Sequence, residues 1–261
     1  MFKSFLSKLF SSEPKYEPFV RQKAHRPPAA AQEAPADPAS AALLRAIEER
    51  RKIDPLVGAK MGGKEIFARL LRGLQNERGV HVETLLCAAG ALAGYACQAG
   101  LRSAAGAQGY SEKDVFTIVE AGGKKFYFGD HLNKPLCESQ YSVWSLAAGA
   151  AQSNGCKELP DLHEIFKHVA ASVGEPTFGI PRIPEGHQPG EKPVFFVKLM
   201  WPIFEPIVKE FCPDPFEWPI MFGSAIAQVL DFSKTVIAPD LALRIVMESA
   251  VPMSKVDLSA E

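Results

Sequence analysis

The feature that most constrains the fold is a long segment that is apolar on every side. VETLLCAAGALAGYACQAGL, residues 82–101, contains no proline and one charged residue. A helix of this kind is buried in a protein core or in a membrane. Its most apolar part, residues 85–99, is shorter than a bilayer span and rich in Ala and Gly, so we predict a central buried helix. Gly90 and Gly94, four residues apart, predict close approach of a neighbouring backbone.

Other segments with helical spacing of apolar residues surround this one in the sequence. Helices are predicted at residues 41–52, 64–78, 138–153, 160–173, 215–231 and 239–249. Residues 194–212 also look helical, but Pro202 and Pro206 predict two segments or one kinked helix. Between these helices, DVFTIVE and KKFYFGD, joined by AGG, predict a β-hairpin over residues 114–130. An isolated hairpin is marginal, so a further strand or a helix must support it.

These patterns predict an α+β fold, predominantly α-helical, with helices packed around a small antiparallel β-hairpin or sheet. We expect one globular domain over residues 41–261. Residues 13–40, rich in Pro and Ala, predict a disordered linker. Residues 1–12 predict a short amphipathic helix, because their large apolar residues share one helical face. Such a face suits a partner's groove or a membrane surface.

Charge and cysteine content limit the possible functions. Lys and Arg number 29 and Asp and Glu number 30, so no strong net charge favours nucleic acid, and we expect none as a partner. The five cysteines are scattered without the spacing of a zinc site, which is typical of a reduced, cytoplasmic protein. His163 and His168 are five apart and therefore lie on different sides of a helix. We expect no metal and no cofactor.

The sequence GAKMGGKE, residues 58–65, resembles a phosphate-binding loop in its glycine and lysine spacing. The loop requires a preceding strand and a Ser or Thr after the lysine. Here Glu65 follows Lys64, and Pro55 interrupts the preceding residues. We therefore interpret the stretch as a glycine turn that enters a helix near Lys64, with Glu65 in its first turn, where the helix dipole favours a carboxylate.

A possible nucleophile lies after the hairpin. Cys137 is predicted just before a helix, where free N–H groups stabilise a thiolate. His131 is the candidate base, and Asp130 or Asn133 would orient its imidazole. His81 and His187 are alternative bases. The competing interpretation is that Cys137 is a small buried hydrophobic residue.

The same segment has a second possible use in recognition. Tyr127, Asn133, Tyr141 and Trp144 are candidates for contacts with a ligand or partner, because loops on rigid supports carry much of protein recognition. The competing interpretation places Tyr127 over the edge of the hairpin.

The last third is rich in aromatic residues and prolines. Its aromatic series comprises Trp201, Phe204, Phe211, Phe216, Trp218 and Phe222. We expect these residues in the core, with an apolar pocket as the alternative. Residues 175–193 predict a long ordered loop, of a length common in lids and binding loops.

Taken together, the sequence predicts a cytoplasmic, bacterial, adaptor-like protein that binds a ligand or another protein without catalysis. The expected partner contact is residues 1–12 or the loop 129–137, with peripheral contact to a membrane surface as an alternative. The alternative function is a thiol-dependent hydrolase or transferase that uses Cys137 and His131.

Overall fold

The computed structural model describes residues 38–258. The amphipathic helix predicted for residues 1–12 and nearly all of the linker predicted for 13–40 lie outside the described residues. The described chain is predominantly α-helical and contains two small antiparallel sheets of two strands each. The predicted fold class is therefore confirmed.

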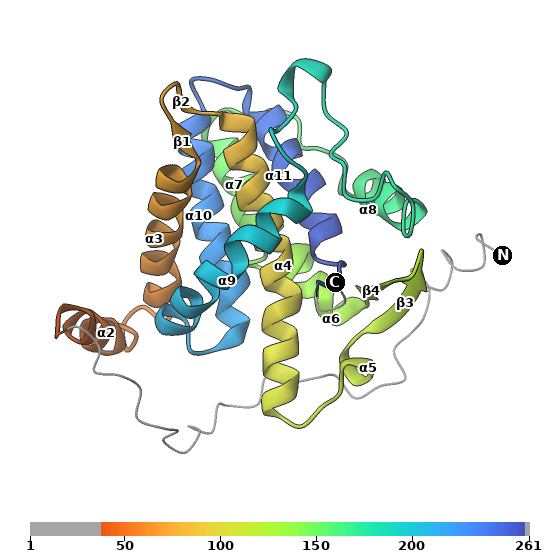
Figure 1. Cartoon of the computed structure of the whole chain (residues 1–261). Coiled ribbons are helices and arrows are strands. Elements are labelled where there is room, and N and C mark those ends of the chain that lie inside the picture. Colours follow the sequence, from red (N-terminus) through yellow and green to blue (C-terminus); the bar gives the residue numbers. More distant parts are fainter. Residues whose placement is uncertain (1–37, 259–261) are drawn as a thin grey trace. The chain divides into compact units, whose positions relative to one another are not determined.

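Helix α4 (Val82–Ala107) lies at the centre of the core. Helices α9 (Pro193–Phe211), α10 (Trp218–Ser233) and α11 (Pro239–Met253) pack around it (Figure 1). By length and composition α4 alone among the described helices qualifies as a membrane span. However, 83% of its most apolar 18-residue window is buried inside the protein, which is what a core helix requires.

Two glycines of α4 allow α11 to approach closely. A Cβ atom added at Gly90 would collide with the carbonyl oxygen of Val246, and one added at Gly94 would collide with that of Ala250. Both collisions involve backbone atoms, which cannot move aside cheaply. The close approach predicted from the four-residue spacing is present, and it determines how tightly the two helices pack.

Helix α3 (Val57–Leu74) begins earlier than the glycine stretch predicted. The stretch GAKMGGKE lies inside the helix, so Glu65 is not in its first turn and the expected glycine turn is wrong. The physical reason is packing: Gly62 contacts Met221 and Gly63 contacts Ser224, both on α10. Because backbone N–H groups within a helix bond along its axis, this segment does not form a phosphate cradle.

Several shorter elements precede or connect the long helices. They are α2 (Pro38–Arg50), β1 (Gln75–Asn76), β2 (Gly79–Val80), α5 (Glu112–Val115), α8 (Leu162–Ala171), η2 (Glu185–His187) and η3 (Pro215–Glu217). Helix α9 is continuous through Pro202 and Pro206, rather than divided into two segments. Each proline removes one helical hydrogen bond, and the burial of the inner face of α9 offsets that loss.

The predicted hairpin consists of β3 (Thr117–Ala121) and β4 (Lys124–Phe128). The residues that follow α11 support this hairpin. The Tyr127 N–H donates to the Lys255 carbonyl at 2.8 Å, and Phe126 forms an isolated bridge with Val256. Residues after α11 thus extend the hairpin by a short third pairing, which supplies the support that two strands alone need.

The region after the hairpin differs from the helix predicted over residues 138–153. A short helix α6 (Asp130–Asn133) leads into a π-helical turn, η1 (Lys134–Glu138), and the chain then breaks before α7 (Val143–Ser153). The Ser142 side chain caps α7, accepting a hydrogen bond from the Ser145 N–H at 3.1 Å. A serine cap of this kind starts a new helix, so Cys137 belongs to the preceding turn.

The predicted long loop is tied to the helical body by Arg182. Its guanidinium donates to Glu248 of α11 at 2.8 Å and to Glu164 of α8 at 2.9 Å. Near the C-terminal end of the loop, the Gly190 N–H donates to the Thr84 hydroxyl of α4 at 2.8 Å. These contacts fix the middle and the C-terminal part of the segment against three helices.

Candidate functional site

A cleft with a volume of about 770 Å³ lies between α4 and α9. Its lining combines aromatic, aliphatic and charged side chains with the last described residue of the chain. The lining residues are Tyr95, Ala99, Arg102, Ser103, Val197, Lys198, Trp201, Pro202, Glu205, Trp218 and Leu258. We call this hollow the α4–α9 cleft.

Aromatic rings form the apolar part of the cleft. The Trp201 ring lies edge-on to Tyr95, with centroids 5.0 Å apart, and 6.2 Å from the Trp218 ring. The Trp218 indole N–H donates to the Cys212 carbonyl at 2.9 Å, so this group is already bonded within the protein. Burial raises the pKa of the Tyr95 hydroxyl, which therefore stays neutral near pH 7.

Charged groups lie along the same cleft. Arg102 forms an ion pair with Glu112 at 2.8 Å, and Glu205 forms one with Lys209 at 2.8 Å. Lys198 is exposed one helical turn before Pro202. The cationic groups in and beside the cleft are Arg102, Lys125, Lys198 and Lys209, and the carboxylates are Glu112, Glu205 and Asp257. The balance is slightly positive.

The predicted nucleophile lies in surroundings that disfavour a thiolate. Burial and, to a smaller extent, the charge of Glu138 raise the pKa of the Cys137 thiol to about 11, and Lys255 only partly opposes them. The thiol donates a hydrogen bond to the Asn133 carbonyl, with a sulfur–oxygen distance of 3.4 Å. The predicted stabilisation by a helix N-terminus is absent, because Cys137 is the fourth residue of the π-helical turn.

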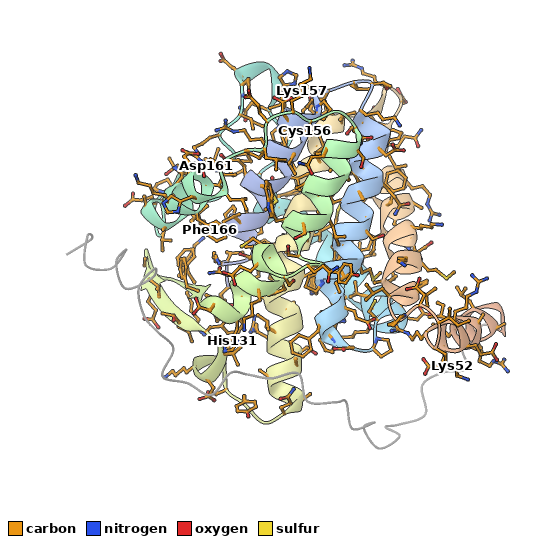
Figure 2. The ribbon with its side chains drawn as sticks, turned by 180° about the vertical axis from the view of Figure 1, so that it is seen from behind. Lys52, His131, Cys156, Lys157, Asp161 and Phe166 are labelled. Carbon is orange, nitrogen blue, oxygen red and sulfur yellow. The ribbon has the colours of Figure 1, made fainter. Side chains whose placement is uncertain are left out.

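The predicted base, His131, is on α6 (Figure 2). Burial and Lys134 lower the pKa of its imidazole, while the charge of Asp130 opposes them. Asp130 is exposed at the start of α6. The charges that act on Cys137 come from Glu138 and Lys255, so the two predicted catalytic groups have different electrostatic surroundings.

The four residues predicted for recognition are not gathered on one surface. Tyr127 is fully buried, with its hydroxyl 3.0 Å from a Glu112 carboxylate oxygen and 3.1 Å from one of Asp257. The amide oxygen of Asn133 accepts a hydrogen bond from Lys255. Trp144 is half-buried on α7, whereas Tyr141 is 45% exposed and is available to a partner.

Lys255 is a buried cation that sequence patterns do not reveal. Its ammonium lies 3.3 Å from the Asn133 amide oxygen, 5.5 Å from the Phe128 ring and 5.4 Å from the Phe166 ring. Phe166 projects from α8 (Figure 2). Burial lowers the pKa of the lysine to about 8. The sequence around it, SKVD, is polar and indicates a solvated chain end.

The sequence interpretation also did not identify the residues that line the cleft, although their spacing along two helices indicates a shared face. Tyr95 and Arg102 are seven residues apart, which places them on one face of the central helix. Lys198, Trp201 and Glu205 follow the same rule on α9. Polar residues within such apolar helices mark a side that does not enter the core.

Comparisons with protein-family models, curated proteins and solved structures give no match. Across residues 38–258, no group of three His, Cys, Asp or Glu side chains is placed to hold a metal ion. The site is therefore defined by its own geometry alone.

Proposed function

We propose that this protein is a non-catalytic, adaptor-like ligand-binding protein whose α4–α9 cleft takes a small planar aromatic molecule with an anionic group. The observation that carries this proposal is the combination of a cleft of about 770 Å³ with two indole rings and a tyrosine in its lining. Ligand pockets commonly have volumes of roughly 300–1,000 Å³ and mainly apolar walls with a few polar groups. This cleft has both properties.

The aromatic part of the ligand follows from the three rings. Tyr95, Trp201 and Trp218 pack against one another in the wall of the cleft, with the Tyr95 and Trp218 ring centroids 5.0 and 6.2 Å from that of Trp201. Tyr95 is half-buried, whereas Trp201 and Trp218 are 8% and 2% exposed and offer only a small part of their surface. An added aromatic ring packs well against such surfaces, edge-to-face or offset. A ligand of this shape also needs little conformational ordering when it binds.

The anionic part follows from the charge of the lining. Arg102 and Glu205 already have ion-pair partners in Glu112 and Lys209, so the positive charge that distinguishes the lining comes mainly from exposed Lys198. Cations near a partly dry cleft favour a carboxylate, sulfonate or phosphate on the ligand. Lys198 is the most suitable group to approach it, because its side chain is exposed.

For the adaptor part, we propose a protein contact through residues 1–12 or through the loop 129–137, with a membrane surface as the alternative partner and the cytoplasm as the location. Exposed Tyr141, which follows this loop, supports a contact there. The thiol-dependent alternative through Cys137 and His131 has no comparable support, because burial disfavours the thiolate.

Isothermal titration calorimetry with three naphthalene probes tests the ligand proposal. We expect 2-naphthalenesulfonate to bind more tightly than 2-naphthylmethanol, and 2-naphthylmethylammonium to bind most weakly. K198E weakens the sulfonate several-fold by reversing a charge at the cleft, whereas K167E, at an exposed site on α8, leaves it unchanged. Absence of binding by all three probes, or equal losses in both variants, would overturn the proposal.

A further inference from the structure

The outer face of α9 carries an exposed apolar stripe. Phe195, Leu199 and Ile203 are 43%, 53% and 58% exposed, although each is a large apolar residue. They recur at four-residue intervals, so they lie in one row on one side of the helix. At a rise of about 1.5 Å per residue, the row extends over about 12 Å. We call this row the α9 stripe.

The stripe leads into a hollow of about 390 Å³ between α9 and α3. The residues lining this hollow are Arg69, Arg72, Gly73, Met200, Ile203 and Phe204. Ile203 belongs to both the stripe and the hollow, which joins the two features into one surface. No atom lies within 4 Å of a Cβ built at Gly73, so the α3 side of the hollow is open.

The charge beside this surface is positive. Arg69 and Arg72 are 43% and 70% exposed, and they share one carboxylate, Glu65, at 2.6 and 4.0 Å. Exposed Lys198 is next to the stripe on α9 itself. One carboxylate for two guanidinium groups leaves an excess of positive charge along the edge of an apolar row.

We propose that this surface docks an amphipathic helix of another protein, with apolar residues at three- and four-residue spacing and carboxylates along one flank. An apolar row with a hollow is the arrangement that helix-in-groove recognition uses. The carboxylates would meet Arg69 and Arg72, which are suited to bidentate contacts. A second copy bound by the same face is disfavoured, because a symmetric contact brings like-charged groups together.

The test uses the full chain and a designed sixteen-residue amphipathic peptide with a leucine row and a glutamate flank. A matched peptide carries lysines in place of the glutamates. We expect the acidic peptide to bind, measured by fluorescence anisotropy, and the basic peptide to bind at least about tenfold more weakly. Equal binding of both peptides, or no binding of either at millimolar concentration, would overturn the proposal.

Matched variants locate the contact. L199E and R72E should each weaken the acidic peptide about tenfold or more. I53E and R45E, which make the same changes at exposed positions away from this surface, should not. Loss of affinity in the control variants as well would refute a contact at α9. Sedimentation of the free protein tests the second copy: a dimer that L199E dissociates would mean that the protein itself covers this face.

Discussion

Arg51 donates hydrogen bonds to both carboxylate oxygens of Glu217, at 3.0 and 2.9 Å, and a third to the Phe211 carbonyl at 2.8 Å. Glu217 is only 6% exposed, and burial raises the pKa of its carboxyl group despite the ion pair. The pair joins the turn after α2 to η3, which are far apart in the sequence. It therefore holds the N-terminal end of α3 close to η3, the turn that directly precedes α10.

Removing one partner of this pair should be costlier than removing both. We expect R51M to lower the free energy of unfolding by about 3–5 kcal/mol, because it leaves the Glu217 carboxylate buried without its cation. The double variant R51M/E217M should recover a large part of that loss. Urea denaturation of the two variants measures the difference, and a double variant less stable than R51M would contradict this explanation.

Replacing Lys255 should stabilise the protein near neutral pH. With a folded pKa of about 8 and an unfolded pKa of about 10.4, the unfolded chain holds the extra proton between these values. Stability due to this group therefore rises as pH increases from 8 to 10.4, and the charged lysine is unfavourable below pH 8. K255M should gain up to about 3 kcal/mol at pH 7.

Comparing the pH dependence of unfolding in the wild type and in K255M isolates this contribution. The difference between them should be largest at pH 7 and should shrink toward pH 10. A difference that does not change with pH would mean that Lys255 keeps its ordinary pKa despite its burial.

Gly94 should tolerate no side chain. We expect G94A to lower stability by more than about 2 kcal/mol, because its methyl group would enter the Ala250 carbonyl of α11. G73A provides the matched control, since the space at Gly73 is open. Gly73 lies in the last turn of α3, and G73A should raise stability by up to about 0.5–1 kcal/mol, because alanine loses less backbone entropy in a helix than glycine. Thermal unfolding of both variants measures the contrast, and destabilisation by G73A would contradict it.

Cys137 should react slowly with thiol reagents. With a pKa of about 11, its thiolate fraction at pH 7.4 is roughly 300-fold below that of a peptide cysteine with a pKa of about 8.5. Iodoacetamide labelling followed by mass spectrometry at each cysteine gives the rate. A rate above that of a free peptide cysteine would support the thiol-dependent alternative.

The fold was largely predictable because it depends on apolar periodicity. The buried α4, the hairpin and the helix α11 were predicted from the periodic spacing of apolar residues. The helix boundaries that depend on tertiary contacts could not be predicted in this way. Gly62 and Gly63 look like a helix start in the sequence, but α10 packs against them and the helix begins at Val57.

The candidate site was less predictable, because its residues come together only through the packing of distant helices. The sequence interpretation concentrated on the segment after the hairpin, where Cys137 and His131 are close in the chain. Tyr95 and Trp201 are far apart in sequence, and their rings meet only because α9 crosses α4 (Figure 1). The aromatic series in the last third did include Trp201 and Trp218, with a pocket as its alternative role.

The measurement that most directly tests ligand binding in the cleft is an indole NMR spectrum of the ¹⁵N-labelled protein. The chain has three tryptophans, and two of them, Trp201 and Trp218, line the cleft, whereas Trp144 is on α7. On addition of 2-naphthalenesulfonate, the Trp201 signal should shift with saturation while the Trp144 signal stays in place. A spectrum in which Trp201 does not respond, or in which Trp144 responds equally, would contradict binding in the α4–α9 cleft.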